Sequence, residues 1–132
     1  LGDVIARVHL EVPPDPELVR LARLVVSGVA SVTAMGLEEV EDCRAAVDEM
    51  CSTLIEVAAT GATMRVELVS YGTTLEVTGS LPVEPGHAID EVRRELSEMI
   101  LAVVTDHHEL RLSDGEGWFR FTRRARARSS PG

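Results

Sequence analysis

The stretch from Val40 to Ala58 constrains the fold of this chain more than any other. Its apolar residues recur at helical spacing and predict a long amphipathic helix. The expected buried stripe of this helix is Val40, Val47, Cys51, Leu54 and Ala58. A second stripe consists of Ala45, Glu49, Thr53 and Glu56, because residues three and four apart are neighbours on a helix. The polar residues of that second stripe are the first candidates for a functional site.

Periodicity and turn residues predict the elements on either side of this helix. Apolar alternation favours strands over residues 4–12, 63–69, 73–78, 109–112 and 118–122. Asp15 and Pro16 are typical of a helix start, so we expect a helix over residues 18–34, ended by Gly36 in the left-handed conformation. Its expected buried stripe is Leu18, Leu21, Ala22, Val25, Val29 and Val32, and Gly28 is expected to mark a close backbone contact.

A third helix is predicted over residues 88–105. Its expected core stripe is Ile89, Val92, Leu96, Met99 or Ile100, and Val103. The resulting order, β–α–α–β–β–α–β–β, predicts an α+β fold: a two-layer sandwich of a mainly antiparallel five-stranded sheet with three helices on one face. We expect one domain over residues 1–123, followed by a disordered, Arg-rich tail over residues 124–132.

Charge is distributed unevenly along the chain. The net charge is −9, all 22 acidic residues precede position 117, and five of the 13 basic residues lie in the last 13 positions. An acidic body argues against direct nucleic-acid binding. No apolar run is long enough for a membrane span and the start does not resemble a secretory signal, so a cytoplasmic protein is expected. The acidic residues that open the long helix are expected to be solvated; they are Glu38, Glu39, Glu41 and Asp42.

The two cysteines, Cys43 and Cys51, are eight positions apart on the predicted helix. At 1.5 Å per residue this is about 12 Å, whereas a disulfide needs Cα atoms within about 7 Å. Both are therefore expected to be free, buried thiols. No Cys/His cluster suggests a metal, so no metal site is expected.

Several phrases resemble the anti-sigma-factor serine kinases of bacteria, within the gyrase/histidine-kinase ATPase superfamily. The likeness is strongest over residues 8–58. It is carried by Val12-Pro13, by RLVVSGVAS over residues 23–31, and by EEVED over residues 38–42 leading to AAVDEMC over residues 45–51. The resemblance implies the histidine-kinase-like (Bergerat) ATPase fold, a homodimer formed through Val4–Val12 and Leu18–Val29, and sigma factors or STAS-type anti-anti-sigma proteins as partners.

The resemblance also assigns site residues. It implies that Glu49 is the catalytic residue and that Thr53 stands where the family has a magnesium-binding Asn. The family's adenine-binding Asp has no counterpart in TGSLPV over residues 78–83, and its phosphate-binding Gly-x-Gly corresponds to Ser97-Glu98-Met99. Thr53, Ser80 and Ser97 are thus the degenerate ATP and magnesium positions. We expect no cofactor, the alternative being ATP with magnesium.

Three functions remain open at this stage. The first is an anti-sigma-factor-like regulator that binds proteins without ATP. The second is an active kinase of the anti-sigma type that phosphorylates a serine of an anti-anti-sigma partner, with Glu49 as its base. The third is a dimerisation or sensing module within a larger regulator.

Overall fold

Five strands form one antiparallel sheet in the order β1-β2-β3-β5-β4. The computed structural model describes residues 2–126. The strands are β1 (Ala6–Val12), β2 (Met64–Ser70), β3 (Thr74–Pro82), β4 (His107–Ser113) and β5 (Glu116–Arg124). The helices are a short 3-10 turn η1 (Pro16–Leu18), α1 (Val19–Ser31), α2 (Leu37–Ile55) and α3 (Glu91–Val104).

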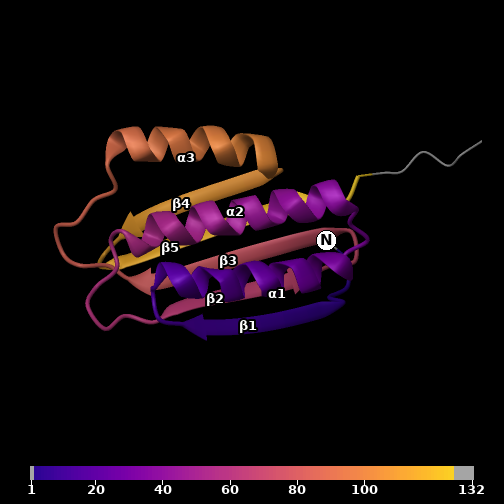
Figure 1. Ribbon diagram of the computed structural model, residues 1–132, viewed down its shortest axis with the longest axis horizontal. Helices are drawn as coiled ribbons and strands as arrows, with labels where there is room; N and C mark the ends of the chain where they lie inside the picture. Colours follow the sequence, from indigo (N-terminus) through magenta and orange to yellow (C-terminus); the bar gives the residue numbers. More distant parts are fainter. Residues whose placement is uncertain (1, 127–132) are drawn as a thin grey trace, which may run out of the picture.

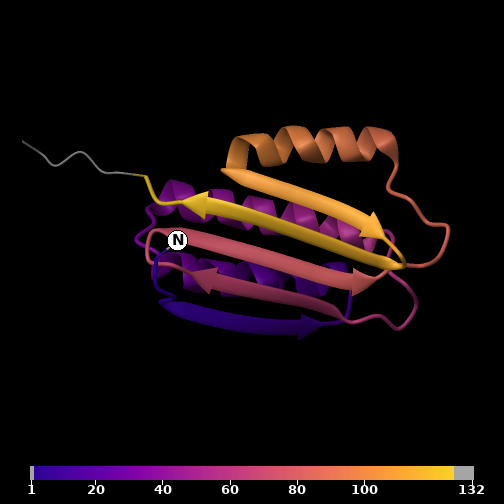
Figure 2. The same ribbon diagram turned by 180° about the vertical axis from the view of Figure 1, so that it is seen from behind.

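The three α-helices cover one face of the sheet and leave the other face open (Figures 1 and 2). In Figure 1, α1 lies along the β1 side of the sheet, α3 along the β4 side, and α2 between them. This arrangement confirms the predicted α+β two-layer sandwich. No helix among the described residues is both long and apolar enough to cross a membrane.

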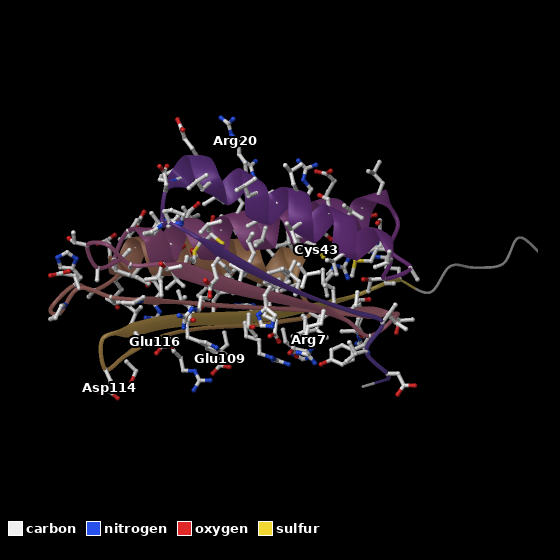
Figure 3. All side chains as sticks on the ribbon, turned by 90° about the horizontal axis from the view of Figure 1, so that it is seen from below. Arg7, Arg20, Cys43, Glu109, Asp114 and Glu116 are labelled. Atoms are coloured by element: carbon white, nitrogen blue, oxygen red, sulfur yellow. The ribbon has the colours of Figure 1, made fainter. Side chains whose placement is uncertain are left out.

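The core lies between α2 and the sheet. Phe119 and Phe121 of β5 are fully buried there, together with Met50 and Leu54 of α2. Cys43 and Cys51 are free and fully buried, as predicted, and burial raises the pKa of both thiols to about 12. Figure 3 shows Cys43 between the helices and the sheet, whereas Arg7 and Glu109 project from the open face.

The first helix differs from its prediction at both ends. Asp15 accepts a hydrogen bond from the Glu17 amide and opens the 3-10 turn, as a good cap should. However, α1 ends at Ser31 rather than near Ala34, and Ala34 itself takes the left-handed conformation (φ 55°). Gly36 is extended and precedes α2, so its predicted role as a C-terminal cap is wrong.

The predicted buried stripe of this helix is also partly wrong. Leu21 and Val32 are exposed, while Val19, Val26 and Ala30 are buried. A side chain at Gly28 would meet no atom within 4 Å, so the expected close contact is absent. Apolar residues spread widely around α1, so its sequence pattern is compatible with more than one rotation about the helix axis. Packing against α2 determines which rotation occurs.

The acidic start of α2 is not fully solvated. Glu39 is buried and accepts a hydrogen bond from the Arg126 amide at 3.0 Å. Asp42 pairs with Arg123 at 3.0 Å, and Arg123 is itself buried. The prediction of a solvated end is therefore wrong for these two carboxylates, because the end of β5 lies against them.

The last strand extends further than predicted. β5 continues to Arg124, and the amide of Ala125 donates to the Thr73 carbonyl at 2.8 Å. The expected disordered tail over 124–132 is thus wrong for residues 124–126, and residues 127–132 lie outside the described part of the chain. β3 is also longer than predicted, because Gly79 to Pro82 continue the ladder with β5.

The buried face of α3 is the largest departure from prediction. Within α3 the fully buried residues are Ser97 and Leu101, whereas four of the five stripe positions predicted to be buried are exposed. Those four are Val92 at 73%, Leu96 at 50%, Met99 at 68% and Val103 at 82% exposure. Only Ile89, just before the helix, is buried as expected. Polar residues take the place of the predicted stripe against α2.

Candidate functional site

Three of the four predicted site residues meet in one polar cluster between α2 and α3. Glu49 and Thr53 project from α2 one turn apart, and Ser97 faces them from α3. The Ser97 hydroxyl donates to Glu49 Oε1 at 2.6 Å and lies 3.1 Å from Thr53 Oγ1. Arg93, one turn before Ser97, donates from Nη1 to the same Glu49 oxygen. These four residues form what we call the α2–α3 polar cluster.

The cluster is closed to solvent on most sides. Thr53 and Ser97 are 1% and 2% exposed, and the Glu49 side chain is 15% exposed. The hydrogen bond to Glu49 raises the pKa of Arg93 above its ordinary value, so the guanidinium remains charged. Arg93 Nε also approaches Glu56 Oε1 at 3.4 Å. Arg93 therefore balances the charge of the carboxylate for which the resemblance implies a catalytic role.

The chemistry open to Glu49 follows from these partners. A general base must reach the proton that it abstracts and must be free to accept it. One oxygen of Glu49 already accepts from Arg93 and from Ser97. The Thr53 hydroxyl donates to the Glu49 carbonyl within α2 at 2.7 Å. Glu49 and Thr53 are thus occupied within the fold, and their arrangement suits helix–helix cohesion better than proton transfer.

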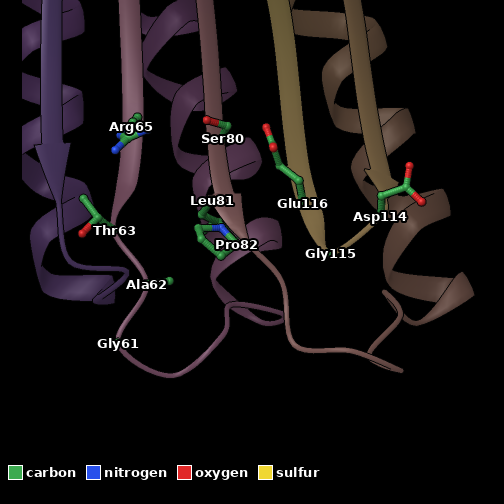
Figure 4. A pocket seen from close by; sticks show the side chains of 10 residues that line it. All are labelled: Gly61, Ala62, Thr63, Arg65, Ser80, Leu81, Pro82, Asp114, Gly115 and Glu116. Atoms are coloured by element: carbon green, nitrogen blue, oxygen red, sulfur yellow. The ribbon is translucent and has the colours of Figure 1, made fainter.

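Ser80, the remaining predicted site residue, does not join this cluster. It lies on β3 and lines a hollow of about 390 Å³ at the end of the sheet, with Arg65, Glu116 and the β4–β5 turn (Figure 4). Successive side chains of a strand point to opposite faces, and Ser80 points to the open face. The structure therefore separates Ser80 from Glu49, Thr53 and Ser97.

Sequence comparison places the chain beside one group of proteins. It is 34% identical to the serine-protein kinase RsbW of Bacillus pumilus over 61 residues, and 39% identical to that of Bacillus subtilis over 49 residues. It is 35% identical to RsbW of Listeria monocytogenes (strain EGD-e) over 74 residues. No family model matches the chain.

Part of the chain is thus similar in sequence to serine-protein kinases named RsbW. The matches cover 46%, 37% and 54% of this chain and 38%, 31% and 47% of the respective RsbW proteins. The chain thus spans between about a third and a half of the length of the relatives that it matches.

Gly79 lies in the region, residues 78–83, where the resemblance to these kinases places the family's adenine-binding Asp. The family's adenine-binding Asp follows the strand that corresponds to β3, and here that region is still strand. Gly79 pairs directly with Phe119 of β5, and a Cβ on Gly79 would lie 2.2 Å from the Phe119 ring. Because Phe119 is fully buried, the ring cannot swing aside into solvent. The space beside Gly79 on the helix side of the sheet is occupied by an aromatic side chain.

The resemblance aligns the family's phosphate-binding turn with a segment that is helical in this structure. Ser97, Glu98 and Met99 lie in the middle of α3, which begins at Glu91. Backbone amides beyond the first turn of a helix donate to carbonyls of the same helix, so these amides are not free to bind phosphate. The first turn of α3 carries Arg93, which reaches Glu49.

Arg93 is the cluster residue that sequence reasoning missed. A signal was present: Arg93 and Ser97 are four positions apart on the predicted third helix, as Glu49 and Thr53 are on the second. Two polar pairs at the same helical spacing can face each other across a helix–helix contact. The apolar pattern at Val92, Leu96 and Val103 hid this signal, because it fits a buried stripe equally well.

Proposed function

We propose that this chain is an anti-sigma-factor-like regulatory protein of bacteria that acts in the cytoplasm by binding other proteins, without ATP. The partners would be a sigma factor, a STAS-type anti-anti-sigma protein, or both. The relationship to the RsbW kinases supports the regulatory context. The observation that carries the proposal is the closed α2–α3 polar cluster, in which Arg93 and Ser97 occupy the carboxylate of Glu49.

Two further observations support the proposal that the chain does not bind nucleotide. The Phe119 ring leaves no room for a side chain at Gly79, and the amides of Ser97 to Met99 lie inside a helix. Adenine recognition and phosphate binding would each need a different local backbone or side chain. An acidic body with a net charge of −9 suits the basic surface of a DNA-binding partner, chiefly by steering its approach.

A homodimer through Val4–Val12 and Leu18–Val29 is part of this proposal. β1 is an edge strand whose outer side pairs with no strand among the described residues. Beside it, α1 exposes Leu21 and Leu24, the latter at 68%. An open strand edge with adjoining apolar side chains can accept a second copy. Sedimentation of the purified protein is expected to give the dimer mass.

Melting temperature with and without ATP tests the nucleotide-free part of the proposal. A ligand that binds the native state raises the melting temperature. We expect no change on adding millimolar ATP and magnesium, and RsbW of Bacillus subtilis serves as a comparison protein under the same conditions. A concentration-dependent rise for this chain would refute the nucleotide-free proposal. Capture of sigma factors or STAS-type proteins by the immobilised wild-type chain tests partner binding, and failure to retain any of them would contradict it.

The alternative is an active serine kinase, and the names of the relatives favour it. Glu49 would then serve as the base, with Thr53 near the magnesium ion. Transfer of radiolabelled phosphate from ATP to a serine of a co-incubated STAS-type protein would establish this activity. Loss of transfer in Glu49→Gln would assign the base.

A further inference from the structure

The exposed apolar stripe of α3 has no part in the proposed function. Val92, Leu96, Met99 and Val103 follow one another at spacings of four, three and four residues, and all are at least half exposed. This spacing is typical of a helix that packs along another helix. All four side chains lie on a single regular helix, so they form one continuous strip, which we call the α3 stripe.

The position of the α3 stripe follows from the contacts of its neighbours. Arg94 donates to the Leu110 carbonyl of β4 and Glu98 pairs with His108 of β4, so their side of α3 faces β4. Arg93 contacts Glu49 and Glu56, so its side faces α2. At about 100° per residue, the stripe lies beyond Arg93 on the side away from β4. It therefore lies on the side of α3 opposite the buried Leu101.

Acidic residues flank the stripe on both sides. Glu91 and Glu95 are exposed and lie next to Met99 and Val92 around the helix. On the other side is Glu56 of α2, whose side chain is 52% exposed. Arg93 between them is engaged with Glu49 and Glu56. An apolar strip with acidic borders is complementary to an amphipathic helix that has basic borders.

A second copy of this chain fits the stripe less well. In an antiparallel two-fold pair of α3 helices, the Glu91 and Glu95 rows of both copies would lie on the same side and repel. Charge therefore favours a basic partner helix over self-association.

We propose that the α3 stripe is a docking site for a basic amphipathic helix of a partner protein. The inference rests on the proposed function in taking the occupant to be a protein partner. In Figure 1 the site lies on the α3 side of the helical layer, across α2 from α1 and β1. A dimer formed through β1 and α1 would leave both stripes accessible, one on each outer edge.

Two synthetic helical peptides test this site on the full chain. One carries leucines at the same four-three-four spacing with lysines on both borders, and the other has glutamates in place of those lysines. Fluorescence anisotropy is expected to show binding of the lysine peptide and at least about tenfold weaker binding of the glutamate peptide. Equal affinity for the two peptides, or no binding of the lysine peptide, would overturn the proposal.

Matched variants locate the binding. Leu96→Ser with Met99→Ser removes the middle of the stripe, and its affinity for the lysine peptide is expected to fall at least about tenfold, since each buried aliphatic side chain contributes that much or more. Leu37→Ser, at a leucine that is 79% exposed at the start of α2, is the control and should bind as the wild type does. Both variants should keep the wild-type melting temperature, because the removed side chains are exposed. Equal losses in the double variant and the control would refute the site.

The same double variant separates this inference from the proposed function. If wild type and double variant capture the same sigma factor or STAS-type protein equally, and the lysine peptide does not bind, the docking site is wrong and the proposed function stands. If the peptide binds at the stripe but the wild type captures neither class of partner, the site stands and the proposed function fails. A dimer that dissociates only in the double variant would identify a second copy as the occupant and overturn the proposal.

Discussion

At the scale of single residues, the guanidinium of Arg93 matters most for interpreting Glu49. Glu49 alone on a helix face is compatible with catalysis, with a salt bridge or with plain solvation. In the structure, Arg93 and Ser97 both donate to one carboxylate oxygen of Glu49 from the facing helix. These bonds make the carboxylate part of the contact between α2 and α3.

Replacing Arg93 tests how much its contact with Glu49 contributes to the free energy of unfolding. Arg93→Ala leaves the largely buried Glu49 with Ser97 as its remaining side-chain donor, and we expect the free energy of unfolding to fall by about 1–3 kcal/mol. Arg44→Ala, which breaks the exposed pair of Arg44 with Glu41 on the same helix, is the control and should cost about 0.5 kcal/mol or less. Urea denaturation measures both variants.

A double variant provides the internal check on that measurement. Adding Glu49→Gln to Arg93→Ala removes the charge that was left without its partner, so the pair should lose less than the sum of the two single changes. Strict additivity would contradict a direct interaction between Arg93 and Glu49.

At the scale of elements, the contact of β3 with β5 decides what the inner face of the sheet can hold. Gly79 follows the predicted strand of residues 73–78, but in the structure it is a position within β3 that the Phe119 ring covers. A glycine opposite a large aromatic residue in a neighbouring strand is a stable combination, because the ring packs over the missing side chain. The same packing excludes a larger residue at that position.

Two glycine-to-alanine changes should therefore have opposite effects. Gly79→Ala forces a methyl group against a buried ring and is expected to lower the free energy of unfolding by about 1–3 kcal/mol. Gly28→Ala, inside α1 with nothing within 4 Å of the new Cβ, is expected to raise it by up to about 1 kcal/mol through helix propensity. Thermal unfolding compares both with the wild type.

Phe119 provides the second arm of this experiment. In Gly79→Ala with Phe119→Leu, the smaller side chain leaves room for the methyl group, so the double change should cost less than the two single changes combined. A stable Gly79→Ala in an otherwise unaltered chain would contradict the packing described for this position.

At the scale of the whole molecule, ion pairs and a hydrogen bond hold the end of β5 against the beginning of α2. Arg123 contacts Asp42 at 3.0 Å and Asp106, just before β4, at 3.6 Å. Glu39 accepts from the Arg126 amide three residues further on. These contacts connect the last described residues with the central helix.

The pH dependence of the free energy of unfolding tests the contact of Glu39 with the Arg126 amide. The hydrogen bond from the Arg126 amide lowers the pKa of Glu39 below its ordinary value of 4.5. A carboxyl whose pKa is lower in the folded state stabilises the fold above its unfolded pKa, and this contribution disappears as the pH falls through the folded value. The difference in stability between the wild type and Glu39→Gln should therefore be largest near neutrality and should shrink below about pH 5.

Denaturation at a series of pH values measures this difference. Glu41→Gln, which removes a carboxylate from the same part of α2, is the control for the loss of one negative charge. Parallel curves for the wild type and Glu39→Gln throughout the acidic range would contradict the role of Glu39.

The sequence by itself determined the fold class, the order of the elements and the free thiols. These follow from local patterns: alternation in the strands, helical spacing in α2, and a cysteine separation too long for a disulfide. It also brought forward Glu49, Thr53 and Ser97, which the fold places together. Only the tertiary structure decided which face of α3 is buried, that Arg93 joins the cluster, and that Phe119 covers Gly79. The physical reason is that periodicity shows that a helix has an apolar side, whereas the partner of each side depends on contacts between elements distant in the chain.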